Sequence, residues 1–205
     1  MKSFDNSFRT NKNALIAGVD EAGRGPLAGP VVAASVIFPV DYDNSEINDS
    51  KKLSAAKREM LFNEIIKNAI TFGYCEIDNC EIDRINILKA SLLAMKKSAE
   101  KLTEKPEIVL IDGNKSFAVG NEYITVVKGD AKSLSIAAAS IIAKVIRDEI
   151  MKEMDKEFPQ YNWAKNKGYP TKEHFEAIDK FGLTPYHRKT FLKKHFQNVQ
   201  LSMNF

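Results

Sequence analysis

The chain has 205 residues, 44% of them hydrophobic and 28% charged, which predicts one well-buried globular domain with at most a small appendage. No apolar run approaches the length of a membrane span, and the polar N-terminus lacks the apolar stretch of a signal peptide. We therefore expect a cytoplasmic protein without a membrane partner. Two cysteines, Cys75 and Cys80, are too few for a disulfide framework, and their spacing differs from redox and zinc pairs, so we expect free thiols.

The net charge of +3 is unevenly distributed along the chain. From residue 158 to the end there are eight Lys and Arg against three Asp and Glu, and all three histidines lie there too. A basic end beside a slightly acidic body is typical of a protein that binds and cuts a polyanion. A solvated basic surface explains the same charges equally well, so charge alone does not decide.

In chain order, a polar lead-in of residues 1–13, which we expect to be loosely held, precedes the first apolar run. Apolar and β-branched runs predict strands over residues 14–19, 31–38, 71–77, 107–111 and 122–127. Apolar residues at intervals of three and four predict helices after Ser54 and over residues 81–102, 133–156, 171–181 and 187–196. The change in composition after Pro159 marks the one candidate subdomain boundary.

Acidic residues stand at the ends of three predicted strands: Asp20 with Glu21, then Asp112, and then Asp130. If these strands are neighbours in one sheet, four carboxylates converge at a single rim, where α/β proteins bind ligands. Oxygen ligands without thiol or imidazole favour Mg²⁺ or Mn²⁺, and two such ions suit phosphodiester hydrolysis. The alternative is that the acids are turn residues or helix caps, and it stays open because a sequence does not show convergence.

A glycine-rich turn follows the acidic pair, with Arg24 between Gly23 and Gly25. The two glycines let the backbone approach a ligand closely, and Arg24 could hold a phosphate. The pattern matches neither the P-loop nor the dinucleotide fingerprint, so we expect no nucleotide cofactor. A tight hairpin turn with an exposed arginine is the other interpretation.

Taken together, these motifs resemble the type 2 ribonucleases H, the ribonuclease HII family of bacteria. The resemblance extends in order from residue 14 to about residue 195. It rests on GVDEAGRGPLAGPVVAA at 18–34, NDSKKL at 48–53, IDG at 111–113, GDAKS at 129–133, NKGYPT at 166–171 and TPYHRKTF at 184–191.

The resemblance implies a ribonuclease H-like α/β fold, with a central five-stranded mixed sheet flanked by helices and a small helical C-terminal part. Residues 14–157 would form the catalytic domain, and residues 158–197 would form the substrate-binding part. The implied activity is endonucleolytic hydrolysis on the 5′ side of ribonucleotides, in RNA–DNA hybrids and at single ribonucleotides embedded in duplex DNA. The products would carry 3′-hydroxyl and 5′-phosphate ends, and the role would be ribonucleotide removal in DNA replication and repair.

The resemblance also implies roles for individual residues. It assigns metal binding and catalysis, with two Mn²⁺ or Mg²⁺ ions, to Asp20, Glu21, Asp112 and Asp130. It assigns recognition of the ribose 2′-hydroxyl, the group that distinguishes RNA from DNA, to the backbone of Gly23, Arg24 and Gly25. It assigns packing on the nucleotide beyond the ribose to Tyr169.

Further contacts with the substrate backbone follow from the same resemblance. Ser50 and Lys51 match a serine–lysine pair that would contact phosphates near the cut. Weaker candidates, for phosphate contact or for structural support, are Lys144, Arg147, His187 and Arg188.

The tail, residues 198–205, lies outside the family's pattern. Its last six residues, Gln200 to Phe205, resemble the hexapeptide that binds the bacterial sliding clamp, because apolar Leu201, Met203 and Phe205 alternate as in an extended peptide. The alternative is that the tail folds back onto the C-terminal helices. We expect a monomer.

Two other activities remain open from the sequence. One is a nuclease that cuts long RNA–DNA hybrids without preference for single ribonucleotides. The other is a catalytically silent nucleic-acid-binding module, although the presence of all four acids argues against it.

Overall fold

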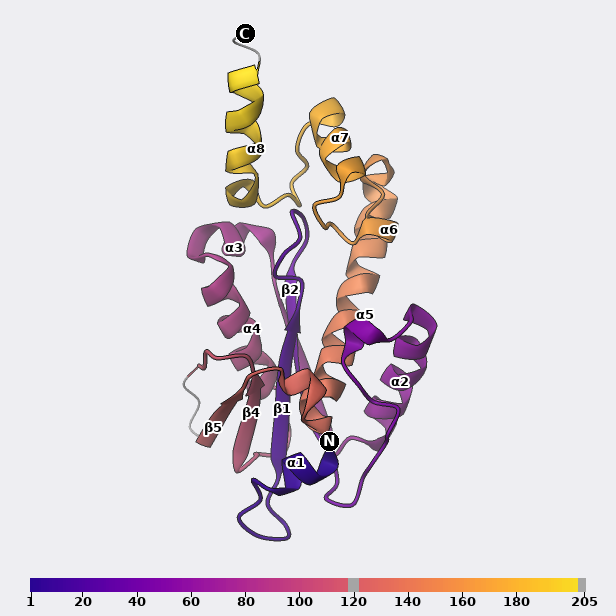
Figure 1. Ribbon diagram of the computed structural model, residues 1–205, viewed down its shortest axis with the longest axis vertical. Helices are drawn as coiled ribbons and strands as arrows, with labels where there is room; N and C mark the ends of the chain where they lie inside the picture. The colour runs from indigo at the N-terminus through magenta and orange to yellow at the C-terminus, as the bar shows by residue number, and fades with distance from the viewer. Residues whose placement is uncertain (118–121, 203–205) are drawn as a thin grey trace.

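The computed structural model describes residues 1–117 and 122–202, and for residues 198–202 it describes the backbone alone. Its centre is one mixed sheet of five strands in the order β3–β2–β1–β4–β5 (Figure 1). Strand β2 is antiparallel to both β1 and β3, whereas β4 is parallel to both β1 and β5. The strands are β1 (Ile16–Ala22), β2 (Val31–Ile37), β3 (Thr71–Ile77), β4 (Ile108–Asp112) and β5 (Glu122–Val126). The expected five-stranded mixed sheet is therefore confirmed.

Helices cover both faces of this sheet (Figure 1). The α-helices of the described residues are α1 (Lys2–Asn6), α2 (Ala55–Asn68), α3 (Asn79–Ile85), α4 (Ile87–Glu100), α5 (Leu134–Glu157), α6 (Trp163–Asn166), α7 (Lys172–Phe181) and α8 (Lys189–Ser202). No helix in this part of the chain is long and apolar enough to cross a membrane.

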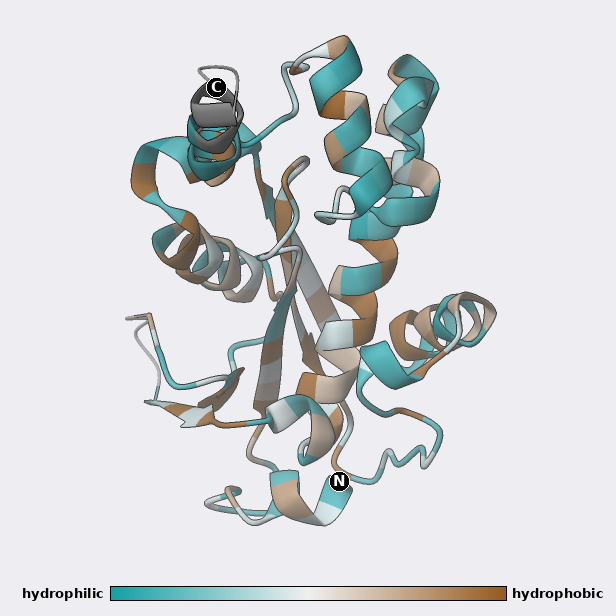
Figure 2. Cartoon of the chain, turned by 45° about the horizontal axis from the view of Figure 1, so that its top comes forward, coloured by the Kyte–Doolittle hydropathy of each residue, from teal (hydrophilic) through white to brown (hydrophobic). Residues whose placement is uncertain are grey.

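Apolar cores on both faces of the sheet hold the layers together. On one face, α5 and α2 pack on the sheet through residues such as Val36, Leu61 and Ile141. On the other face, α3 and α4 pack through residues such as Ile82 and Met95. In Figure 2 hydrophobic and hydrophilic bands alternate along the helices, as they do in helices with one buried side.

The start of α5 lies directly against β1, and this contact positions the chain around the acidic residues. Ser133 caps the helix by accepting a hydrogen bond from the Ile136 amide. A Cβ atom on Gly18 would lie only 2.1 Å from the carbonyl carbon of Ser135. Glycine at this position of β1 is therefore required for the close approach of strand and helix.

The structure differs from the expected elements near Asn86 and in the N-terminal lead-in. The helix expected over residues 81–102 is two helices, because Asn86 has a φ of 71° and ends α3, while its side chain caps α4 by accepting from the Lys89 amide. The lead-in is also more ordered than expected. Asp5 of α1 is buried, and its carboxylate accepts hydrogen bonds at 2.9 Å from the amide and the hydroxyl of Ser135.

After α5 the chain forms the expected small helical part, which is fastened to the loop between β1 and β2. Trp163 and Leu192 share an apolar core with Leu27 and Ala28 of that loop. The Leu27 amide also donates to the Gly168 carbonyl at 2.7 Å. Helix α8 continues to Ser202, beyond the expected limit of residue 196, so the backbone of residues 200–202 is helical and not extended as expected, while residues 203–205 lie outside the described residues.

Candidate active site

The four acidic residues gather at one end of the sheet. Asp20 and Glu21 lie within β1, which continues to Ala22 instead of ending before them as expected. Asp112 is the last residue of β4, and the parallel register of β1 and β4 places it beside Asp20. The strand order, which puts β4 next to β1, thus creates the convergence that the sequence left open.

Asp130 joins them from the 3-10 turn Gly129–Ala131, which lies just before α5. The Gly129 amide donates to Asp112 Oδ1 at 2.7 Å, so the turn is tied to the end of β4. Lys51 Nζ lies 3.3 Å from Asp130 Oδ2, and its side chain is 77% exposed. Lys51 therefore borders the acidic cluster, whereas the neighbouring Ser50 is buried and its carbonyl accepts a hydrogen bond from Arg58.

The surroundings of these carboxylates disfavour their ionised form. Burial raises the pKa of Asp20 well above its ordinary value, and the charges of Glu21, Asp112 and Asp130 raise it further. Burial is also the main cause of the raised pKa values of Glu21 and Asp112. Because each shift opposes ionisation, the folded chain lacks enough positive charge to stabilise these acids as anions.

The residues fit a divalent cation bound by oxygen. Two cations lie nearby, Lys51 beside Asp130 and Arg24, whose Nη1 is 3.1 Å from Glu21 Oε1. The other Glu21 oxygen, Oε2, is buried without a hydrogen-bond partner. Within the described ranges, no three Asp, Glu, His or Cys side chains already have the arrangement of a formed metal site. An unsatisfied buried oxygen in a carboxylate cluster is nevertheless what a hard cation would stabilise.

The glycine-rich turn and Tyr169 are brought together next to the acids. Gly23 has a φ of 96°, and a Cβ atom there would lie 2.0 Å from Arg147 Nε, so only glycine fits. A Cβ atom on Gly25 would lie 3.7 Å from Tyr169 Cε1, which places the tyrosine ring beside the turn. Tyr169 is 41% exposed, so its ring is accessible to a ligand.

Two buried arginines hold the turn in place. Arg188 donates from Nη2 to the Gly23 carbonyl at 2.7 Å, from Nη1 to the Arg24 carbonyl at 3.1 Å, and from Nε to the Gly29 carbonyl at 2.9 Å. Its guanidinium is fully buried, and burial lowers its pKa to about 9. Arg188 thus supports the turn, which is one of the two roles expected for it.

Arg147 also supports this loop. It donates to the carbonyls of Pro30, Ala28 and Lys167 at 3.0, 3.2 and 3.0 Å. Because Lys167 lies two residues before Tyr169, Arg147 links the glycine-rich loop to the tyrosine segment.

The other two weak candidates also have structural partners. His187 is buried, and its Nδ1 accepts from the Thr184 amide at 2.9 Å. Lys144 pairs with Asp148 one turn along α5, and burial lowers the pKa of Lys144. The two cysteines are free, as expected, with Cys75 buried and Cys80 exposed.

Comparison with known proteins yields one family. A family model described as ribonuclease HII matches residues 17–199. Ribonuclease HII of Caldanaerobacter subterraneus subsp. tengcongensis is 54% identical over 194 residues, which cover 95% of this chain and 80% of that protein. The crystal structure of ribonuclease H2 from Pyrococcus horikoshii OT3 is similar with a TM-score of 0.73 and 27% identity, over 86% of this chain and 93% of that one. Ribonuclease HII from Archaeoglobus fulgidus, solved as a complex with PCNA, is similar with a TM-score of 0.70 and 28% identity, over 85% of this chain and 93% of that one.

Proposed function

Since the chain belongs to the ribonuclease HII family of endoribonucleases, we propose that it cuts the phosphodiester bond on the 5′ side of ribonucleotides, in RNA–DNA hybrids and at single ribonucleotides embedded in duplex DNA. The observation that carries this proposal is that two groups of residues lie next to each other. Four carboxylates lie at one end of the sheet, and the turn Gly23–Gly25 with Tyr169 lies next to them. The contact between Arg24 and Glu21 links the two sites directly.

Asp20, Glu21, Asp112 and Asp130 would hold Mn²⁺ or Mg²⁺. When bound, a pair of such ions supplies an activated water and stabilises the leaving oxygen of an in-line displacement, which gives 3′-hydroxyl and 5′-phosphate ends. The chain itself provides carboxylate oxygens from β1, from β4 and from the turn before α5, and one of those oxygens, Glu21 Oε2, has no partner in the protein. Lys51, exposed beside Asp130, is placed to contact a backbone phosphate near the cut.

Ribonucleotide recognition would come from the peptide groups of Gly23, Arg24 and Gly25. Because Arg188 holds two of their carbonyls, the turn is preorganised, and a ribose that lacks the 2′-hydroxyl would leave polar groups unpaired. Tyr169 beside Gly25 would pack on the following nucleotide and restrict the position of its sugar. Recognition and cleavage would then depend on the same short segment after β1.

The decisive experiment uses a DNA duplex with one embedded ribonucleotide, incubated with Mn²⁺, with Mg²⁺ or with a chelator. We expect metal-dependent cleavage at the 5′ side of the ribonucleotide, with a 3′-hydroxyl on the upstream fragment. A 2′,3′-cyclic phosphate would refute the mechanism. Cleavage of a long hybrid without cleavage of this duplex would identify a hybrid-specific nuclease, and binding without cleavage would identify a silent module.

We also propose that the tail binds the bacterial sliding clamp, which would deliver a monomeric, cytoplasmic enzyme to newly copied DNA for ribonucleotide removal. The support is the sequence pattern of Gln200–Phe205 and the archaeal relative that was solved as a PCNA complex. Calorimetric titration against the β clamp would compare the full chain with a chain that ends at residue 199. Equal binding by both, or by neither, would reject the proposal, and cleavage of short duplexes should be the same for both.

A further inference from the structure

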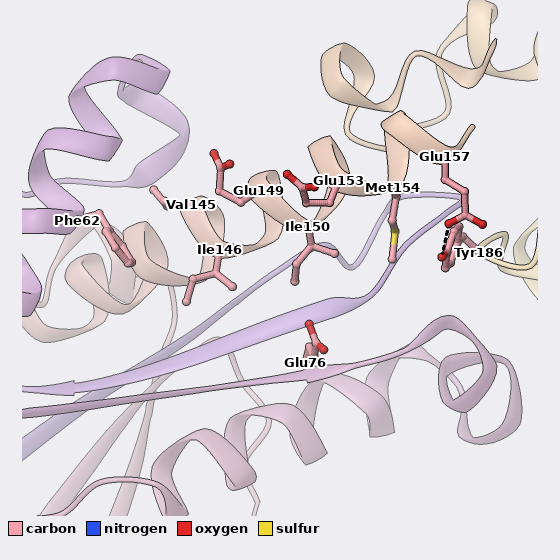
Figure 3. Close-up of a pocket in the computed structure, with 10 residues that line it drawn as sticks. All are labelled: Phe62, Glu76, Val145, Ile146, Glu149, Ile150, Glu153, Met154, Glu157 and Tyr186. Atoms are coloured by element: carbon pink, nitrogen blue, oxygen red, sulfur yellow. Dashed lines mark hydrogen bonds between the residues drawn. The ribbon is translucent and has the colours of Figure 1, made fainter. Parts of the chain in front are cut away.

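A groove of about 590 Å³ runs along α5 on the side that faces β3 (Figure 3). Its apolar wall consists of Ile146, Ile150 and Met154, which are spaced by four residues and therefore lie on one side of the helix. Phe62 of α2 lies at one end of the groove and Tyr186 at the other (Figure 3). None of the proposed metal-binding or ribose-recognising residues lines it, so it is a separate surface.

A second hollow of about 340 Å³ extends this groove, because both are lined by Glu76, Ile150, Met154 and Tyr186. The apolar surface continues along β3. Phe72 and Tyr74 are 36% and 42% exposed, and the alternation of side chains along a strand puts them on the same face as Glu76. Exposed apolar surface of this extent is typical of a site that binds another molecule.

The groove is bordered by acidic side chains. Glu149, Glu153 and Glu157 form a second row on α5, and Glu76 points toward Ile150 from β3 (Figure 3). Glu149 and Glu153 pair with Lys152 and Lys156 of the same helix, and because the two glutamate side chains are 53% and 67% exposed, these pairs add little stability and can be exchanged for other cationic partners. In the described part of the chain, Glu76 takes part in no ion pair.

These charges decide the chemistry of the occupant. The net charge of the rim is negative, because Glu76 and Glu157 add to the two lysine-paired glutamates without an ion-pair partner among the described residues, and this charge disfavours a polyanion. A segment with apolar side chains on one face and Lys or Arg beside them would bury its apolar side against Ile146, Ile150 and Met154. Its basic side chains would then meet the glutamates at the rim.

We propose that this groove binds a basic amphipathic helix of a partner protein. The row of α5 side chains at four-residue intervals forms a ridge beside which the apolar side chains of a second helix, at positions i, i+4 and i+7, can pack. None of the proposed metal-binding or ribose-recognising residues takes part in this contact.

A titration with two synthetic peptides tests this proposal on the full, ¹⁵N-labelled chain. The first is a 14-residue helical peptide of leucine and lysine, and the second has glutamate in place of every lysine. We expect the lysine peptide to shift amide resonances of α5, β3 and the segment around Tyr186, and to bind at least tenfold more tightly than the glutamate peptide. Shifts centred on Asp20 and Asp112, equal affinity of the two peptides, or no binding would overturn the proposal.

Variants with reversed charges on α5 test whether the peptide binds at this groove. Glu149→Lys combined with Glu153→Lys should weaken binding of the lysine peptide at least tenfold, and Ile150→Ala should weaken it severalfold. The matched control is Glu173→Lys combined with Glu176→Lys on α7, where both side chains are similarly exposed and paired with lysines. Equal effects of the two double reversals would contradict the proposal. Thermal unfolding confirms that each variant is folded, and ribonucleotide cleavage by the α5 variants should match that of the original chain.

Discussion

The acidic cluster and the arginine pair are both groups of buried like charges, yet they differ in their partners. Arg188 and Arg147 each donate three hydrogen bonds to carbonyl oxygens, so both cations are satisfied within the fold. In the acidic cluster, Glu21 Oε2 has no partner, and burial and mutual repulsion raise the pKa of Asp20. Burial of charge alone therefore does not identify a functional site. What distinguishes the acidic cluster is that several carboxylates repel one another and one of their buried oxygens has no partner, whereas each arginine is bonded to three carbonyl oxygens.

The largest effect should come from Asp20→Asn or Asp112→Asn, which removes a proposed metal-binding charge but keeps the shape of the side chain. We expect cleavage at a single ribonucleotide to fall at least about 10³-fold, which corresponds to about 4 kcal/mol of transition-state stabilisation. Folding stability should be unchanged or higher, because the raised pKa values show that the ionised carboxylates are unfavourable in the fold. A parallel loss of cleavage, duplex binding and stability would show that these acids are structural.

Substitution in the arginine pair should mainly reduce folding stability, whereas substitution of the acids should mainly reduce cleavage. Arg188→Ala leaves the carbonyls of Gly23, Arg24 and Gly29 without their donor, and we expect it to lower the free energy of unfolding by about 3–4 kcal/mol in chemical denaturation. Lys189→Ala, at the exposed neighbouring position, is the control and should change stability by no more than about 0.5 kcal/mol. If both variants have the same stability, the contrast between the two regions is wrong.

The buried side chain of His187 is a third case, because burial favours its neutral form and should make folding stability depend on pH. Burial lowers the pKa of His187 to about 4, below the ordinary value of 6.5, so between these values the unfolded chain binds more protons than the folded one. Stability should therefore be complete above pH 6.5 and should fall by roughly 3 kcal/mol as the pH drops toward 4. Denaturation across this range should show a weaker pH dependence for His187→Gln than for the original chain, and identical curves would contradict the prediction.

The smallest effect concerns Tyr169, whose proposed role needs only the aromatic ring. Tyr169→Ala should reduce cleavage at a single ribonucleotide by an amount equivalent to about 1–2 kcal/mol, with a smaller effect on binding to plain duplex. Tyr169→Phe should retain most of the activity. Tyr74→Ala is a matched control, since Tyr74 is 42% exposed and Tyr169 is 41% exposed. An unchanged rate for Tyr169→Ala would mean that this ring has no part in recognition.

The sequence by itself determined the local elements and the residue types of the site. Strands β2 and β3 end within one residue of their predicted limits, because apolar and β-branched runs are properties of neighbouring residues. Ser54 and Ser133 cap α2 and α5 at the start of the predicted helices for the same reason. The motif around Asp20 was sufficient to indicate the family.

Only the tertiary structure decided which of these residues meet. The strand order places Asp112 beside Asp20, and the packing of the C-terminal helices places Tyr169 beside Gly25. Arg188 has no local feature that distinguishes it from a solvent-exposed arginine, because its carbonyl partners lie about 160 residues earlier in the chain. Contacts over such separations depend on how whole layers pack, and the pattern of neighbouring residues carries no record of that packing.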